Sequence, residues 1–245
     1  MIDQWKKGAK YWDKAWNPVI GCRKVSEGCQ NCYSKGMSER FPELRDADGG
    51  FAPHSPTSTK CPPRKGVVFV CNMTDIFGEW NDFDTIFGWM SQFCGGPYLV
   101  LTKRVERMRQ YLCKHYARWD TWYGMTAENQ ERYKDRIKAF RGICKASGLH
   151  RWLSAEPLLG PIDMQLQYIP PEDNKPFDWV VVGAESGPNR RPCKIEWVES
   201  LVCQCRMFGI PVFVKQLEID GKLEKDIAKF PKHLQIRQVP WQWEF

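Results

Sequence analysis

Short apolar runs that alternate with helical stretches constrain the fold of this chain more than any other feature. Two clear examples are 66–71, Gly-Val-Val-Phe-Val-Cys, and 178–183, Asp-Trp-Val-Val-Val-Gly. Continuous runs rich in β-branched residues are typical of strands that a parallel sheet buries on both faces, with helices as the connections. The sequence predicts strands at 16–20, 66–71, 98–102, 121–126, 150–154, 178–183 and 211–215, and helices at 33–41, 82–94, 104–117, 130–147 and 194–208.

Parallel strands joined by right-handed crossovers can close, or nearly close, into a barrel. We therefore predict an α/β fold, a (βα) barrel or partial TIM-like barrel of about six to seven parallel strands. An open, doubly wound sheet is the alternative, because periodicity does not separate the two architectures. The length fits a single domain, 1–245, with a cysteine loop at 21–36, an irregular lid loop at 42–65 and a C-terminal closing segment at 217–245.

The most specific chemical feature is a C-x6-C-x2-C pattern formed by Cys22, Cys29 and Cys32. Three thiolates without a close fourth ligand fit a [4Fe–4S] cluster held by three cysteines, with one iron open to a small molecule. They also fit a tetrahedral zinc ion with His54, Cys61 or a water as the fourth ligand. Three free cysteines are the simplest alternative, and the odd number disfavours a disulfide.

Composition narrows the partners of the chain. A net charge of +7 favours anionic partners, nucleic acid among them. The N-terminus lacks the apolar core of a signal peptide, and no apolar run is long enough to span a bilayer. We therefore expect a cytoplasmic protein without a membrane partner, whose 11 cysteines are reduced, metal-bound or catalytic.

Polar residues follow the apolar runs at the points where the predicted strands end. In a parallel barrel all strand C-termini open on the same face, which is where the active site is built. We therefore expect these residues to converge around the cysteine loop, although polar residues also simply begin loops. They are Cys22, Asn72, Asp75, Thr102, Lys103, Thr126, Glu128, Ser154, Glu156, Glu185, Lys215 and Gln216.

Residues 16–33, which contain the three cysteines, carry a resemblance to a known family. Further segments match in the same order over nearly the whole chain. The sequence resembles a phage-encoded three-cysteine-motif family of largely unassigned function, which is itself similar to the radical S-adenosylmethionine (SAM) enzymes. The further matching segments are 72–75, 101–104, 128–130, 153–157, 183–188 and 214–216.

This resemblance implies a radical-SAM-like barrel with a [4Fe–4S] cluster, SAM and an electron donor, and formation of a 5′-deoxyadenosyl radical. The cluster would be held by Cys22, Cys29 and Cys32. The implied cofactor-binding residues are Tyr33, Asn72, Asp75, Thr102, Glu128 and Asn129, and the implied catalytic or substrate-binding residues are Lys103, Glu156, Glu185, Lys215 and Gln216.

The substrate is expected to be a nucleotide or a base of DNA or RNA, which the enzyme would modify or repair. Basic charge, many aromatic residues and the resemblance to a phage family favour this class. A zinc-stabilised nucleic-acid-binding protein without catalysis is the main rival, and it would make His54 or Cys61 essential. An iron–sulfur protein with only a structural or redox role is a third hypothesis.

Overall fold

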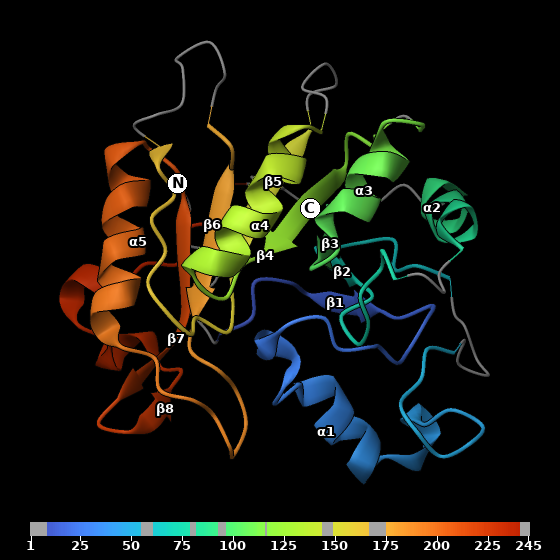
Figure 1. Ribbon diagram of the computed structural model, residues 1–245, viewed down its shortest axis with the longest axis horizontal. Helices are drawn as coiled ribbons and strands as arrows, with labels where there is room; N and C mark the ends of the chain where they lie inside the picture. Colours follow the sequence, from blue (N-terminus) through green and yellow to red (C-terminus); the bar gives the residue numbers. More distant parts are fainter. Residues whose placement is uncertain are drawn as a thin grey trace. The chain divides into compact units, whose positions relative to one another are not determined.

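The computed structural model describes residues 9–54, 61–78, 82–92, 97–115, 117–143, 149–166 and 175–240. The strands form one eight-stranded sheet, in which they follow one another in chain order from β1 (Lys14–Trp16) to β8 (Lys222–Glu224) (Figure 1). The α/β class is therefore confirmed, with a largely parallel sheet. Closure into the predicted TIM-like barrel is not found, since the described residues show no pairing of β8 with β1.

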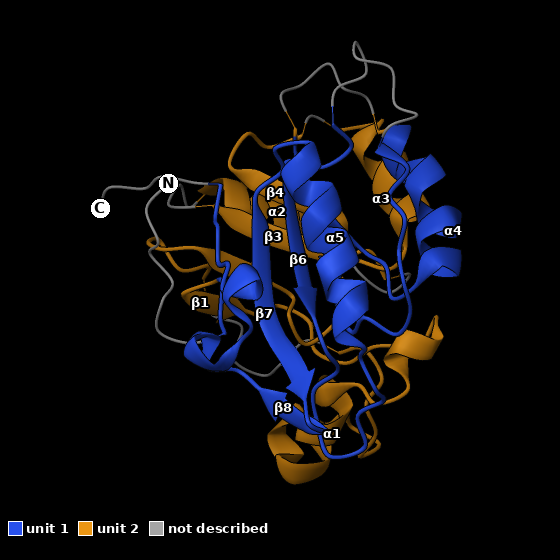
Figure 2. Cartoon of the chain, turned by 90° about the vertical axis from the view of Figure 1, so that its left-hand side faces the viewer, with its two compact units in different colours: residues 1–11, 124–142, 150–245 blue, residues 12–123, 143–149 orange. Residues whose placement is uncertain are grey.

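The chain divides into two compact units (Figure 2). Unit 1 contains Met1–Tyr11, Gly124–Gly142 and His150–Phe245, and unit 2 contains Trp12–Tyr123 and Ile143–Leu149. The interpretation of the whole chain as a single domain stays a prediction.

Unit 2 is built on parallel strands with apolar side chains. Lys14 pairs with Val68 and Val68 with Tyr98, and every residue of β2 is buried. Phe77, Phe87 and other apolar side chains form its core. Its elements are β1, η1 (Glu27–Cys29), α1 (Tyr33–Arg40), η2 (Pro42–Leu44), β2 (Val68–Val70), α2 (Phe83–Gln92), β3 (Tyr98–Thr102), α3 (Val105–Leu112) and the first half of β4 (Thr121–Thr126).

Aromatic side chains form part of the core of unit 1. The ring of Tyr11 makes edge contacts with Trp152, Trp179 and Phe213, at centroid distances of 5.9, 5.2 and 5.5 Å. These last three residues lie on neighbouring parallel strands. The elements of unit 1 are the second half of β4, α4 (Gln130–Arg141), β5 (His150–Ala155), β6 (Trp179–Gly183), α5 (Ile195–Met207), β7 (Val212–Ile219), β8, η6 (Ile227–Lys229) and η7 (Lys232–Leu234).

The C-terminal segment covers the outer edge of β7. β8 pairs with β7 in antiparallel orientation, and Phe213 forms an antiparallel bridge with Arg237. The backbone N–H of Val214 also donates to the carbonyl oxygen of Ile236, at 2.9 Å. Because the chain's own C-terminal segment occupies this edge, β7 does not offer it to another parallel strand. Residues 241–245 of the predicted closing segment lie outside the described residues.

The first strand lies earlier than predicted, at Lys14–Trp16 instead of 16–20. Pro18 lacks a backbone N–H and therefore cannot continue the hydrogen-bonded ladder. Ile20 forms an isolated antiparallel bridge with His54 instead. Within the described part of the chain, no helix combines the length and apolar character needed to cross a membrane.

Candidate functional site

The cysteine loop is held against the segment 51–54 of unit 2. Ile20 and His54 exchange two backbone hydrogen bonds, of 2.9 and 2.8 Å, and the N–H of Cys22 donates to the carbonyl oxygen of Phe51. Gly21 between them has a φ of +89°, and a Cβ atom there would lie 2.1 Å from the carbonyl oxygen of Ala52. The close approach of the two segments therefore requires glycine at position 21.

The three cysteines of the motif are free thiols, and each is half-buried. Cys29 ends η1, and Cys32 is the residue before α1. Within the described ranges, no three His, Cys, Asp or Glu side chains are grouped so as to hold a metal ion. By donor type alone, three thiols from one short segment of one unit match a thiolate-bound cluster, and that they hold one stays a prediction.

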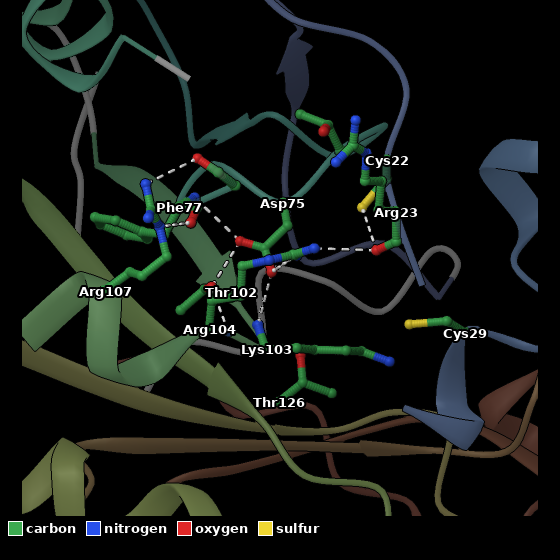
Figure 3. Close-up of polar contacts among 12 residues, drawn as sticks. Cys22, Arg23, Cys29, Asp75, Phe77, Thr102, Lys103, Arg104, Arg107 and Thr126 are labelled. Atoms are coloured by element: carbon green, nitrogen blue, oxygen red, sulfur yellow. Dashed lines mark hydrogen bonds and ion pairs between the residues drawn. The ribbon is translucent and has the colours of Figure 1, made fainter. Parts of the chain in front are cut away.

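The thiols of Cys22 and Cys29 differ in acidity. Burial raises the pKa of Cys22, and the charge of Asp75 adds to this effect. Burial also acts to raise the pKa of Cys29, but the charge of Lys103 and hydrogen bonds from Val25 and Ser26 outweigh it and lower the pKa overall. The Lys103 side chain extends toward Cys29 (Figure 3). Lys103 thus favours the thiolate form of Cys29, which is the form that binds metals.

In the metal-free protein near pH 7.5, we expect iodoacetamide to alkylate Cys29 faster than Cys22. The thiolate is the reactive form, and the lowered pKa of Cys29 places more of it in that form at a given pH. Peptide mass spectrometry after timed quenching gives the two rates. Lys103→Gln should slow the alkylation of Cys29 and leave the alkylation rate of Cys22 unchanged. Equal rates for both thiols in the wild type would contradict this assignment.

Asp75 is the hydrogen-bonding centre of the adjoining strand ends. Its carboxylate accepts hydrogen bonds from the Thr102 hydroxyl at 2.6 Å, the Lys103 backbone N–H at 3.0 Å and the Phe77 backbone N–H at 3.0 Å (Figure 3). It also forms an ion pair with Arg104, with 3.0 Å between Nη1 and Oδ2. Two neighbouring parallel strands, β2 and β3, therefore bring Asp75, Thr102 and Lys103 together, as expected for strand ends.

Arg104 links this centre to the cysteine loop. Its Nη2 donates to the backbone carbonyl of Arg23 at 3.1 Å, directly after Cys22. Its side chain is 11% exposed. The Asp75 carboxylate is thus engaged by an arginine and by three other donors, so it orients Arg104 and the loop. Asp75 is therefore better placed to hold the shape of the site than to bind a ligand directly.

Asn72 presents an unused acceptor in the same unit. Its side-chain Oδ1 is buried and has no hydrogen-bond partner within the part of the chain that the structure describes. The hydroxyl of Tyr33 donates to the backbone carbonyl of Asn72, and the hydroxyl of Thr74 donates to the carbonyl of Gly21. A buried acceptor without a partner costs free energy, which a ligand with an N–H donor would recover.

In unit 1, Glu156 directly follows β5 and meets Lys215, which lies within β7 and not at its end as predicted, because β7 continues to Ile219. The distance between Lys215 Nζ and Glu156 Oε1 is 2.8 Å, and the two side chains are 22% and 12% exposed, respectively. The other carboxylate oxygen accepts hydrogen bonds from the hydroxyls of Tyr11, at 3.1 Å, and Ser154, at 3.3 Å. The Lys215 ammonium also lies over the Tyr11 ring, 5.7 Å from its centroid. This arrangement places one acid and one ammonium side by side and partly open to solvent.

Glu185 follows the end of β6 and Gln216 lies within β7, and both have partners within their own unit. Glu185 forms a bidentate pair with Arg191 and is almost completely buried. Gln216 donates to the carbonyl of Ala184 at 2.6 Å and lies 2.9 Å from the Ser186 hydroxyl. These contacts fold the 184–191 turn back onto the strand ends. That the strand ends of both units line one common site stays a prediction.

Glu128 and Asn129 serve the fold of α4. Glu128 is fully buried and pairs with Arg136, with 2.6 Å between Oε2 and Nη1. Asn129 is the N-cap of the helix, and its Oδ1 accepts a hydrogen bond from the Arg132 N–H at 3.0 Å. Both side chains thus have clear structural roles, whereas the resemblance implied that they bind the cofactor.

Sequence reasoning did not assign the partners of the predicted carboxylates. They are Tyr11, Arg104, Arg136 and Arg191. For two of these partners, a short spacing in the sequence could have indicated the pairing. Arg136 follows Glu128 by two helical turns, and Arg104 comes directly after a strand end. The pairing of Tyr11 with Glu156 joins positions 145 residues apart, which no local pattern indicates.

Residues 6–238 match a sequence family described as a protein of unknown function (DUF5131). The match covers most of the chain, so the chain belongs to this family. No curated protein matches the chain, and no solved structure matches it either. The description of the family names no activity, ligand or partner.

Proposed function

We propose that this member of the family is a radical-SAM-like iron–sulfur enzyme that acts on a nucleotide or a nucleic-acid base. The observation that carries the proposal is the set of three free, half-buried thiols from one short loop, Cys22, Cys29 and Cys32. In the sequence, no further Cys or His stands between Cys32 and His54, which would leave one iron of a three-cysteine cluster open to SAM. When bound, the cluster would supply the electron that cleaves SAM to a 5′-deoxyadenosyl radical.

The residues around the loop support this proposal by their chemistry. The lowered pKa of Cys29 favours a thiolate ligand. The buried Oδ1 of Asn72 offers an acceptor to a charged amine, such as the one on the methionine part of SAM. Asp75 holds Arg104 and, through it, the backbone beside Cys22. The chain would thus position ligands through Asn72 and keep the loop in place through Asp75.

The substrate side of the proposal rests on unit 1. The Glu156–Lys215 pair, with Tyr11 and Ser154, offers an anionic and a cationic group to polar atoms of a substrate. The net charge of +7 favours an anionic substrate such as a nucleic acid. A phage origin, a host-cytoplasmic location and an external electron donor belong to the same proposal.

Metal analysis after anaerobic purification tests the proposal. We expect about four irons and four sulfides per chain in the wild type, and loss of both in the Cys22→Ala/Cys29→Ala/Cys32→Ala variant. Addition of dithionite and SAM should then yield 5′-deoxyadenosine with the wild type alone. Circular dichroism of the variant shows whether its fold is retained.

A zinc-stabilised nucleic-acid-binding protein is the alternative outcome of the same experiment. One zinc per chain without iron would reject the radical-SAM proposal and favour this alternative. His54→Ala or Cys61→Ala would then release the metal. An intact cluster without 5′-deoxyadenosine formation would instead favour a structural or redox role.

We expect Asn72→Ala to weaken SAM binding by about 10- to 100-fold while stability changes little. The reason is that Asn72 Oδ1 is a buried acceptor with no hydrogen-bond partner among the residues that the structure describes, so its removal breaks no hydrogen bond of that atom. A hydrogen bond to a charged donor contributes about 1.5–3 kcal/mol. Calorimetric titration of the cluster-loaded protein with SAM measures the affinity, and urea unfolding measures the stability. An unchanged affinity would remove Asn72 from the cofactor site.

A further inference from the structure

Unit 2 contains a pocket of about 340 Å³ that none of the predicted site residues lines. Its walls come from α2, from the end of α3 with the turn after it, and from the start of β4. A volume near the lower end of ligand pockets, about 300–1,000 Å³, suits one base with its sugar. Its lining includes Phe87, Gly88, Tyr111, Lys114, His115 and Arg118.

Aromatic rings form a stacked column along this pocket. His115 stacks on Tyr111, with 4.4 Å between centroids and 16° between planes, and Tyr111 stacks on Phe87 at 5.0 Å and 20°. Phe87 in turn stacks on the buried Tyr123. The column therefore begins in the core and ends at His115, whose side chain is 43% exposed. A half-exposed ring at the end of a rigid stack is a surface on which a planar base can stack.

The charged groups of the pocket suit an anionic ligand. Lys114 is exposed and has no ion-pair partner among the residues that the structure describes. Arg118 is held by a bidentate pair with Asp120, and its Nη1 lies 2.9 Å from the Ser91 hydroxyl. Among the described lining residues Asp84 is the only acid, and its Oδ1 lies 3.8 Å from His115 Nδ1. Lys114 is therefore the cation that a phosphate next to a stacked base would meet.

Gly88 leaves the wall on the α2 side open. A Cβ atom at this position would have no heavy atom within 4 Å. Glycine inside a helix is unfavourable by about 1 kcal/mol relative to alanine, so neither packing nor helix propensity explains it. An open wall beside a ring stack is what a planar ligand needs.

We propose that this pocket binds one unpaired base of a single-stranded nucleic acid, stacked on the outer face of His115 at the end of the ring column, with its phosphate at Lys114. The inference rests on the proposed function in that it names the substrate class, yet binding here needs neither the cluster nor SAM. Base stacking tolerates every base, because each has a planar π-face. The pocket thus serves to hold the strand rather than to select a sequence.

Fluorescence anisotropy with a labelled single strand of about eight nucleotides, a length typical of such sites, tests the proposal. Gly88→Leu fills the open wall while it improves helix propensity, and we expect it to weaken binding at least about fivefold. Lys114→Gln should lower the slope of log affinity against log salt by about 0.7. Lys134→Gln, an exposed lysine on α4, is the charge-matched control and should leave the pocket's affinity nearly unchanged.

A strand of the same length made of abasic sites separates stacking from charge attraction. The wild type should bind it at least about fivefold more weakly than the normal strand, and His115→Ala should remove most of that difference. Equal binding of both strands, or wild-type affinity in Gly88→Leu, would overturn the proposal. Thermal unfolding of each variant shows whether its fold is intact.

The triple cysteine variant keeps the two proposals apart. Full binding of the strand by this variant, together with a wild type that contains no iron, would reject the proposed enzyme and leave the pocket standing. If the wild type contains the cluster and cleaves SAM but binds abasic and normal strands equally, only the proposal about the pocket is rejected.

Discussion

Glu128→Ala is expected to lower the free energy of unfolding by about 3–5 kcal/mol, because it leaves the buried Arg136 guanidinium without its counter-charge. The Glu128 side chain is 0% exposed and that of Arg136 8%, and 2.6 Å separate the paired atoms. Arg136 also donates to the carbonyl of Thr126, so it cannot leave the interior without losing that bond as well. Urea unfolding monitored by circular dichroism measures the change.

Glu131→Ala is the matched control for this prediction. Glu131 lies on the same helix and pairs with Arg132 at 2.7 Å, but its side chain is 70% exposed. Such an exposed pair contributes at most about 1 kcal/mol. The double variant Glu128→Leu/Arg136→Met should recover much of the lost stability, since it removes both buried charges. If Glu128→Ala unfolds like the wild type, Glu128 serves a ligand instead of the fold, as the resemblance implied.

The parts of the fold that the sequence predicted well have unambiguous local patterns. The run 98–102 coincides with β3, and 121–126 coincides with β4. β8 was missed because Lys222–Glu224 is short and partly exposed, and because the turn at Asp220 and Gly221 determines its pairing. Barrel closure depends on which segment occupies the edge of β7. That choice is a long-range contact, which no local pattern encodes.

The candidate site shows the same division. Asp75 and Thr102 were expected to meet, and they do, because they follow neighbouring parallel strands. The role of Arg104 was missed because a charged residue in a sequence usually marks a solvated surface, and only burial shows otherwise. Asn72 was selected by resemblance, whereas its unpartnered Oδ1 is a property of the three-dimensional structure alone.

The second large effect is expected from Gly21→Ala. This substitution should impair binding of the proposed iron–sulfur cluster by the cysteine loop, although all three thiols remain. The new Cβ atom would lie 2.1 Å from the carbonyl oxygen of Ala52, so either the loop or the segment 51–54 has to move. The positive φ adds about 1–2 kcal/mol of strain for a residue with a side chain. We expect iron and sulfide per chain to fall below about half of the wild-type values, with a lowered urea midpoint of the metal-free protein.

Gly36→Ala separates this steric effect from a general effect of replacing a glycine near the cysteines. Gly36 lies within α1, four residues after Cys32, and its Cβ atom would meet no atom within 4 Å. The substitution should raise stability by about 0.5–1 kcal/mol and leave the metal content unchanged. If the Gly21→Ala variant contains as much iron and sulfide per chain as the Gly36→Ala variant, the backbone contact between the loop and the segment 51–54 does not position the thiols. The cluster would then have to organise the loop on binding, because metal binding and local folding are coupled.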